Sequence, residues 1–395
     1  MQITVQPVPV SRTLNQALRL LDETFASPEV RAYPRYLGVT ITGDCNIKCI
    51  YCERQRGHNV RDYYFPTDLY EQMEPHFHAA QRVTLLGLGE PFMHKDFERM
   101  VRMAKAAGAE CITTTNATML NDRYRRMLVE IGLDYLGVSV DSPDPATFEL
   151  MRAGAKYERI MEYIRALRDL KRELGVDRPR IGLCMTVSRD NVWHIPNMVR
   201  LAAELGAVDL HLQNVVLYRK EDAAMSVLGT WRMDWMVSRA RKLAADLGIG
   251  LYYVPRDPYT PEFAPETKMS APEKPGRACR EAWTQFLVYD NGDVHPCCFT
   301  EETFGNLRQQ SLEAIHFGEK ATDFRRRIWE GKLPAACVDC GYLIRRDPAE
   351  AERNLAEARA LLSQLSSDEE RAVLSAALAE TEARMAAPLP RSSVG

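Results

Sequence analysis

Short apolar runs alternate with amphipathic segments along most of the chain. The apolar runs have the length of buried strands, and the amphipathic segments repeat their apolar residues at helical spacing. The predicted strands are 36–42, 82–88, 110–116, 134–141, 180–188 and 208–215. The predicted helices are 95–107, 120–131, 144–153, 156–173, 191–205 and 231–247. Six strand-then-helix units predict an α/β fold, a parallel sheet covered by helices that closes only part of a barrel.

The flanking segments have other patterns. Residues 11–25 predict a lead-in helix, 255–278 a connector rich in proline and charge, and 285–299 a β-hairpin that turns near Gly292. A helical pattern follows over 311–330, and residues 347–387 predict two further helices whose apolar positions must pack on the barrel or on a partner. We therefore expect a lead-in helix (1–30), a partial barrel (31–254), a small α+β domain (255–345) and a helical tail (346–395).

Composition narrows the function classes. The 395 residues are 46% hydrophobic and carry a formal net charge of −3, which does not suggest a nucleic-acid partner. No apolar run is long enough to span a bilayer, and the first residues do not resemble a secretory signal. We therefore expect a cytoplasmic protein without a membrane or nucleic-acid partner. In that reducing compartment, the ten cysteines are more typical of metal or redox sites than of disulfides.

Three cysteines lie together directly after the first predicted strand. Cys45, Cys49 and Cys52 form a C-x3-C-x2-C pattern, at the strand end where a barrel carries its chemistry. Three thiolates can hold three irons of a four-iron cluster and leave the fourth iron open to a ligand. The alternative is a zinc site with His58 as the fourth ligand, although structural zinc sites usually take their ligands in pairs.

The triad, with Tyr51 before its last cysteine, resembles the signature of the radical S-adenosylmethionine (SAM) superfamily. The resemblance implies a TIM-like partial barrel in which a [4Fe–4S] cluster binds SAM and cleaves it to a 5′-deoxyadenosyl radical that removes hydrogen from a substrate. The stretch Gly87, Gly89, Glu90 and Pro91 is similar to the family's motif for the SAM amino group. Further SAM contacts implied by position are Asn116, Ser139, Asp141 and Arg152, each of which also fits a turn, cap or solvated charge.

A second cysteine set lies in the C-terminal part. Cys279, Cys297, Cys337 and Cys340 resemble the ligands of a Twitch or SPASM-type extension, which implies one auxiliary [4Fe–4S] cluster with no open iron. Cys298 is left over and could replace Cys297, and a zinc site is the alternative for the whole set.

The remaining candidates concern the substrate. Cys111 fits a buried apolar position, whereas Cys184 and Cys298 are candidate thiol hydrogen donors. His211 and Gln213 share one strand face and, with Asn214, could line a substrate cavity.

These observations favour a radical SAM oxidoreductase that acts on a small-molecule or peptide substrate. An auxiliary cluster would accept an electron, with dehydrogenation or bond formation as the result. A flavodoxin or ferredoxin would supply the reducing electron. The alternatives are a redox-neutral epimerase or rearrangement enzyme with a cysteine hydrogen donor, and a non-catalytic zinc-binding protein.

Overall fold

A computed structural model gives the fold of this chain. It describes residues 10–25, 27–56, 61–253, 277–334, 337, 340, 344–345 and 348–386. His58 and most of the predicted connector lie outside the described residues.

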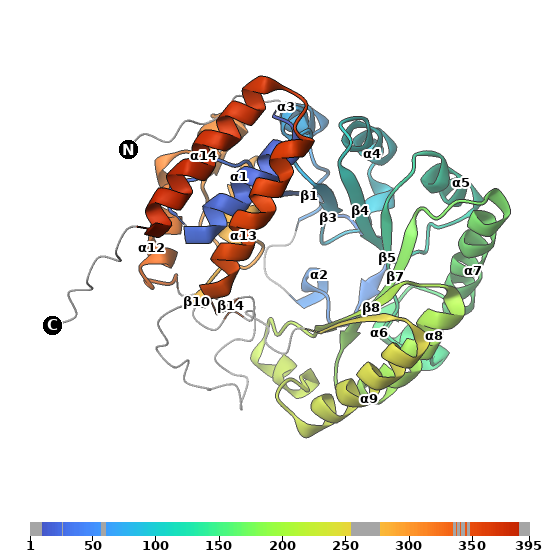
Figure 1. The fold of residues 1–395 in the computed structure, drawn as a ribbon. Coiled ribbons are helices and arrows are strands. Elements are labelled where there is room, and N and C mark those ends of the chain that lie inside the picture. Colours follow the sequence, from blue (N-terminus) through green and yellow to red (C-terminus); the bar gives the residue numbers. More distant parts are fainter. Residues whose placement is uncertain are drawn as a thin grey trace.

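The predicted parallel sheet is confirmed. Its strands are β1 (Tyr36–Thr40), β3 (Arg82–Leu86), β4 (Glu110–Thr115), β5 (Tyr135–Ser139), β7 (Arg180–Val187) and β8 (Asp209–Asn214), and they pair in this order, all parallel. One further parallel strand, β9 (Gly250–Tyr253), pairs with β8 at the edge and was not predicted. The sheet remains open there, so the α/β fold is a partial barrel (Figure 1).

Helices follow the strands and form an outer arc around the sheet (Figure 1). They are α3 (Thr67–Phe77), α4 (Phe97–Ala106), α5 (Asp122–Glu130), α6 (Pro145–Met151), α7 (Tyr157–Leu174), α8 (Ile195–Leu205) and α9 (Trp231–Leu247). Helix α7 is a typical example: its buried residues recur every three or four positions and form one apolar face. Gly175, in the left-handed conformation, ends the helix. Helix α3 was not predicted. Among the described helices, none is both long and apolar enough to cross a membrane.

The C-terminal hairpin extends the same sheet beyond β1. It consists of β11 (Gln285–Val288), β12 (Asp293–His295) and β13 (Gly305–Asn306), with Gly292 at positive φ in its turn. Strand β11 pairs in parallel with β1, from Tyr36 opposite Gln285 to Val39 opposite Val288. The hairpin is as predicted, and its hydrogen bonds connect the C-terminal segment directly to the strand that precedes the first cysteine.

Shorter elements complete the C-terminal part. They are β10 (Arg277–Ala278), which pairs with β14 (Ile344–Arg345), and the helices α10 (Glu281–Thr284), α11 (Leu312–His316) and α12 (Glu319–Trp329). The division of the chain into domains at residues 30, 254 and 345 stays a prediction.

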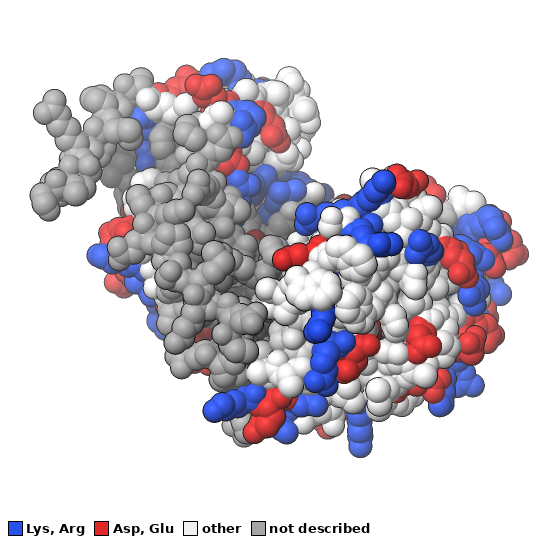
Figure 2. Space-filling model, turned by 90° about the horizontal axis from the view of Figure 1, so that it is seen from below, with Lys and Arg blue, Asp and Glu red and all other residues white. Residues whose placement is uncertain are grey.

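The two ends of the chain pack on each other. Helix α1 (Arg12–Phe25) lies against α13 (Pro348–Leu361) and α14 (Asp368–Ala386), and Figure 1 shows the two C-terminal helices beside it. Their shared core is separate from that of the barrel and includes Leu14, Leu18, Leu21, Leu374 and Leu378. The apolar faces of the tail are thus covered by α1. Elsewhere on the surface, acidic and basic side chains are interspersed over the described residues of one face (Figure 2).

Candidate functional site

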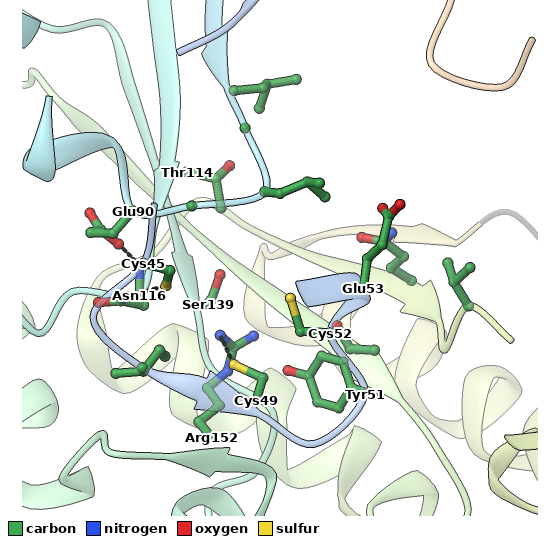
Figure 3. A pocket seen from close by; sticks show the side chains of 18 of the residues that line it. Cys45, Cys49, Tyr51, Cys52, Glu53, Glu90, Thr114, Asn116, Ser139 and Arg152 are labelled. Atoms are coloured by element: carbon green, nitrogen blue, oxygen red, sulfur yellow. Dashed lines mark hydrogen bonds between the residues drawn. The ribbon is translucent and has the colours of Figure 1, made fainter. Parts of the chain in front are cut away.

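A pocket of about 280 Å³ opens at the carboxyl ends of the barrel strands. We call it the main pocket. Figure 3 shows the three predicted thiols around it, with Glu90 and Asn116 beside Cys45 and Arg152 beside Cys49. Of the residues predicted from sequence, the following line it: Cys45, Cys49, Tyr51, Cys52, Gly87, Gly89, Glu90, Asn116, Ser139, Arg152, Gln213 and Asn214.

The cysteine loop is fixed by a short pair of strands. Strand β2 (Lys48–Cys49) pairs antiparallel with β6 (Arg152–Ala153), so that Cys49 lies opposite Arg152. Arg152 donates from Nη1 to Cys49 Sγ at 3.8 Å. Burial raises the pKa of all three thiols, that of Cys49 to about 11. Ionised thiolates here therefore need positive charge close by, which iron ions would supply together with the Arg152 guanidinium.

Glycine is required in the loop after β3 because this loop crosses the backbone that leads to Cys45. A Cβ atom on Gly89 would lie 1.9 Å from the carbonyl oxygen of Asp44, and one on Gly87 would lie 2.3 Å from that of Thr42. The close approach allows Gly89 N–H to donate to Thr42 O at 2.9 Å and Glu90 N–H to donate to Asp44 O at 2.8 Å. The two loops are thereby held in register, and Glu90 is placed at the pocket.

Glu90 is a buried carboxylate with several donors around it. Thr115 Oγ1 donates to Glu90 Oε1 at 2.6 Å, and the Asn116 backbone N–H donates to Oε2 at 2.7 Å. The Phe92 N–H donates to Oε1 at 3.3 Å, which makes Glu90 the cap of the short helix η1 (Pro91–Met93). Burial raises the pKa of Glu90 to about 7 despite these bonds. A cationic ligand such as an ammonium group would stabilise the ionised form. Pro91 itself is the first residue of η1 and does not line the pocket.

Two polar residues at strand ends also line the main pocket. Asn116, directly after β4, donates from Nδ2 to Asn46 Oδ1 at 3.0 Å and to Cys45 Sγ at 3.7 Å. Ser139 is the last residue of β5 and also faces the pocket. Parallel strands bring such residues to one edge of the sheet.

Asp141 lies behind the pocket wall. It is fully buried, and its carboxylate forms an ion pair with Arg152, with Nε 2.6 Å from Oδ2. It also accepts hydrogen bonds from Tyr51 Oη and, at 2.8 Å, from the Thr186 backbone N–H. Asp141 is therefore positioned to orient Arg152 and Tyr51, and it does not line the pocket itself.

The predicted thiol donor Cys184 lies behind the residues that line the main pocket. It lies on β7 in register with Ser139 on β5, receives a hydrogen bond from Thr114, and a Cβ on Gly137 would be 3.2 Å from its sulfur. Thr114 and Ser139 line the pocket, whereas Cys184 does not. His211 is further down β8, stacked on Tyr252 with ring centroids 4.6 Å apart. Cys111 is fully buried in the core.

The second cysteine set lies on either side of the C-terminal hairpin. Cys297, Cys337 and Cys340 are buried, Cys279 is partly buried and Cys298 is exposed. A turn with Cys340 N–H donating to Cys337 O at 3.3 Å holds the last two together. Burial raises the pKa of Cys297 and of Cys337 to about 12. The neighbouring thiols Cys337 and Cys340 raise the pKa of Cys297 further. Cys279 and Cys340 do the same for Cys337. The four buried or partly buried thiols are thus electrostatic neighbours. Among the described residues, no three His, Cys, Asp or Glu side chains are grouped as ligands of one ion.

Sequence reasoning missed nine pocket residues, of which five are polar: Glu53, Thr114, Thr115, Thr186 and Tyr218. The alternation of strand residues carries the signal for one of them, since Thr114 is two positions before Asn116 on the same strand face. Glu53 directly follows Cys52. Tyr218 lies in the loop after β8, and the sequence gives no signal for it.

Comparison with known proteins agrees with this geometry. The family model described as the radical SAM superfamily matches residues 39–202, and the SPASM model, an iron–sulfur cluster-binding domain, matches residues 279–341. The chain is 27% identical over 330 residues to the tungsten-containing aldehyde ferredoxin oxidoreductase cofactor-modifying protein of Pyrococcus furiosus, covering 78% of this chain and 87% of the relative. It is 23% identical over 319 residues to the AdoMet-dependent heme synthase of Nitratidesulfovibrio vulgaris, covering 76% and 83%.

A solved structure of the same fold is that of Streptococcus suis SuiB bound to its precursor peptide SuiA. It matches with a TM-score of 0.56 at 14% identity, over 77% of this chain and 68% of that chain. The matches confirm the predicted resemblance and its cofactors, SAM and a [4Fe–4S] cluster with auxiliary iron–sulfur binding in the C-terminal part. They favour an enzyme over the zinc-binding alternative. The chain therefore carries a radical SAM domain over residues 39–202 and a SPASM-type iron–sulfur domain over residues 279–341, after the barrel.

Proposed function

We propose that this enzyme is an oxidoreductase that removes a hydrogen atom from a small-molecule or peptide substrate and passes an electron to one auxiliary [4Fe–4S] cluster. Dehydrogenation or formation of a bond within the substrate is the expected outcome. The observation that carries the proposal is the pairing of β11 with β1, which joins the second cysteine set to the strand leading to the first.

Cys45, Cys49 and Cys52 are the proposed ligands of three irons at the main pocket. When bound, the reduced cluster and SAM supply a 5′-deoxyadenosyl radical, which abstracts hydrogen from unactivated carbon. The donor set fits this group, because three thiols face a pocket that has a carboxylate on one side and a guanidinium on the other. Glu90 would accept a hydrogen bond from the SAM ammonium group, and Asn116 and Ser139 would offer hydrogen bonds to the polar parts of SAM.

Arg152 has a role shared between SAM and the cluster. Two of its nitrogens are engaged by Asp141, and Nη1 is directed at Cys49 Sγ. We therefore assign it chiefly to balancing the negative charge of the Cys49 thiolate, with its guanidinium edge available to the SAM carboxylate.

The second set is the proposed electron acceptor. Four thiolates from Cys279, Cys297, Cys337 and Cys340 would fill all four iron positions and leave no site for substrate. Tyr289, directly after β11, lies close enough to both the second cysteine set and the main pocket to interact electrostatically with residues of each. Burial raises its pKa to about 12, and Cys298, Cys297 and the pocket residue Glu53 raise it further. This supports a location of the second cluster on the pocket side of the hairpin.

The test separates SAM cleavage from electron acceptance. Reduced, reconstituted enzyme should form 5′-deoxyadenosine from SAM, and Cys45→Ala should abolish this. Cys337→Ala should retain SAM cleavage but lose oxidised product, whereas Cys111→Ala, a core cysteine outside both sets, should behave as wild type. An active Cys45→Ala variant, or unchanged product yield in Cys337→Ala, would contradict the proposal.

A redox-neutral reaction is the second candidate, favoured by the place of Cys184 beside Ser139 on the neighbouring strand and in a hydrogen bond with Thr114. There, the thiol would return a hydrogen atom to the substrate radical and become a thiyl radical, which an electron from the reducing partner and a proton would restore. Solvent deuterium in the product, lost in Cys184→Ala, would establish that outcome instead. The reducing partner, a flavodoxin or ferredoxin, and the cytoplasmic location stay predictions.

A further inference from the structure

A second, smaller cavity lies at the end of the barrel sheet opposite the main pocket. Its volume is about 110 Å³. One wall is a face of α1, and the other is formed by residues that directly precede β1 and β3, the strands whose far ends reach the main pocket. Its lining residues are Arg12, Asn15, Gln16, Arg19, Arg35, Ala79 and Gln81. We call it the arginine pocket.

The spacing of the α1 residues explains why they converge. Positions 12, 15, 16 and 19 fall on one face of a helix. Hydrogen bonds fix that face against the barrel, with Arg12 Nε donating to Ala80 O at 2.7 Å and Nη2 donating to Ala107 O at 3.1 Å. Asn15 Nδ2 donates to Ala79 O at 3.1 Å. The pocket is therefore a built feature of the contact between α1 and the barrel.

The lining of the arginine pocket is strongly cationic. Three guanidinium groups and three amide side chains line it, and no carboxylate does. Arg19 is 7% exposed and pairs with Glu23 behind the lining. Arg35 donates to Gln81 and stacks over Tyr36. Burial lowers the pKa of Arg35, and the positive charges of Arg19 and Arg82 add to the lowering, while Tyr36 and Glu23 oppose it. Like charges this close repel one another, and an anion between them would relieve the repulsion.

We propose that the arginine pocket binds a phosphate-type oxyanion. Guanidinium groups bind such anions through paired, charge-assisted hydrogen bonds, and the amides of Gln16 and Gln81 add further donors, whereas that of Asn15 is bonded to Tyr33 O and Ala79 O. The volume is well below the roughly 300 Å³ at which pockets for larger ligands begin, so a free ion or one terminal phosphate group fits. Because Arg12 and Arg19 come from α1 and Arg35 from the barrel side, the bound anion would tie the helical bundle to the barrel.

The experiment uses the full chain and measures its thermal midpoint during titration with inorganic phosphate against sodium chloride at equal ionic strength. A saturable rise is expected for the wild type. Arg35→Gln and Arg19→Gln should each weaken the apparent affinity at least tenfold. Arg99→Gln, an exposed arginine paired with Glu71 outside the pocket, should leave it unchanged.

Glycerol 3-phosphate is the second ligand arm. Equal affinity for it would identify the phosphate group of a larger molecule as the ligand, and selectivity for inorganic phosphate would identify the free ion. A wild-type response that does not saturate, or an undiminished response in both Arg35→Gln and Arg19→Gln, would overturn the proposal. Neither outcome depends on radical chemistry.

Discussion

Replacing Gly89 by alanine should disable the main pocket while leaving the fold intact. The added methyl carbon would start 1.9 Å from the Asp44 carbonyl oxygen. Non-bonded carbon and oxygen rarely approach within about 3 Å, so the two loops must separate by roughly 1 Å. That shift strains the hydrogen bonds from Gly89 and Glu90 to Thr42 and Asp44, each worth about 1 kcal/mol. Overpacking adds about 1–3 kcal/mol, so the total is about 3–5 kcal/mol if both hydrogen bonds are lost.

The functional cost should exceed what stability alone explains. Cys45 and Glu90 lie on the two loops that separate, and a misplacement of about 1 Å can lower rates by about 100-fold. We expect Gly89→Ala to retain its iron but to form 5′-deoxyadenosine about 100-fold more slowly, with weakened SAM binding. Gly132→Ala is the matched control, because Gly132 has φ of 65° and open space around it. It should cost about 1 kcal/mol through backbone strain and leave turnover unchanged. Wild-type SAM affinity and turnover in Gly89→Ala would refute the reasoning.

Three further predictions follow from the same contacts. Cys45→Ala should lower the iron content from about eight to about four atoms per chain, because the second set keeps its own cluster; a loss of all iron would show that the two sites do not assemble independently. Since the pKa of Glu90 is raised to about 7, the folded apo-protein binds a proton there that the unfolded chain has released, so its stability should fall by about 3 kcal/mol between pH 4.5 and 7. In urea denaturation, the Glu90→Gln variant should not show this fall in stability between pH 4.5 and 7. Identical pH profiles of stability for the wild type and the variant would contradict the prediction. Leu18→Asp places a carboxylate at a position 2% exposed in the bundle core and should cost more than about 3 kcal/mol, whereas Leu150→Asp, at a position 62% exposed, should cost under about 1 kcal/mol.

The local pattern was sufficient for much of the fold. The six predicted strands and the hairpin at Gly292 form as expected, because buried strands and tight turns are determined by short runs of sequence. Strand β9 was missed because its four residues are partly exposed at the sheet edge and lack a clear apolar run. Helix α3 was missed because Pro75 and His76 interrupt its apolar pattern.

Long-range pairing was not readable from sequence. Nothing near Gln285 indicates that its strand will pair with β1, some 250 residues earlier, and the apolar face of the tail predicts burial without naming α1 as the partner. In the site, too, local patterns were predictable and long-range contacts were not. Strand ends located Asn116 and Ser139, whereas the place of Asp141 behind the wall depends on its ion pair with Arg152 from β6. Tyr218 reaches the pocket from an irregular loop that has no periodicity to follow.

The packing of α1 against α13 and α14 also sets the order in which this chain can fold during synthesis. Helix α1 leaves the ribosome before the barrel, whereas the helices that cover its apolar face follow the barrel. At about 5–20 residues per second, translation of the intervening chain leaves that face without its partner for roughly 20–70 s. The barrel can assemble in this interval, but α1 cannot complete its packing until α13 and α14 have left the ribosome. A nascent chain of this protein is therefore expected to bind a chaperone at α1 until α13 and α14 emerge, and ribosome profiling of bound chaperones would test this.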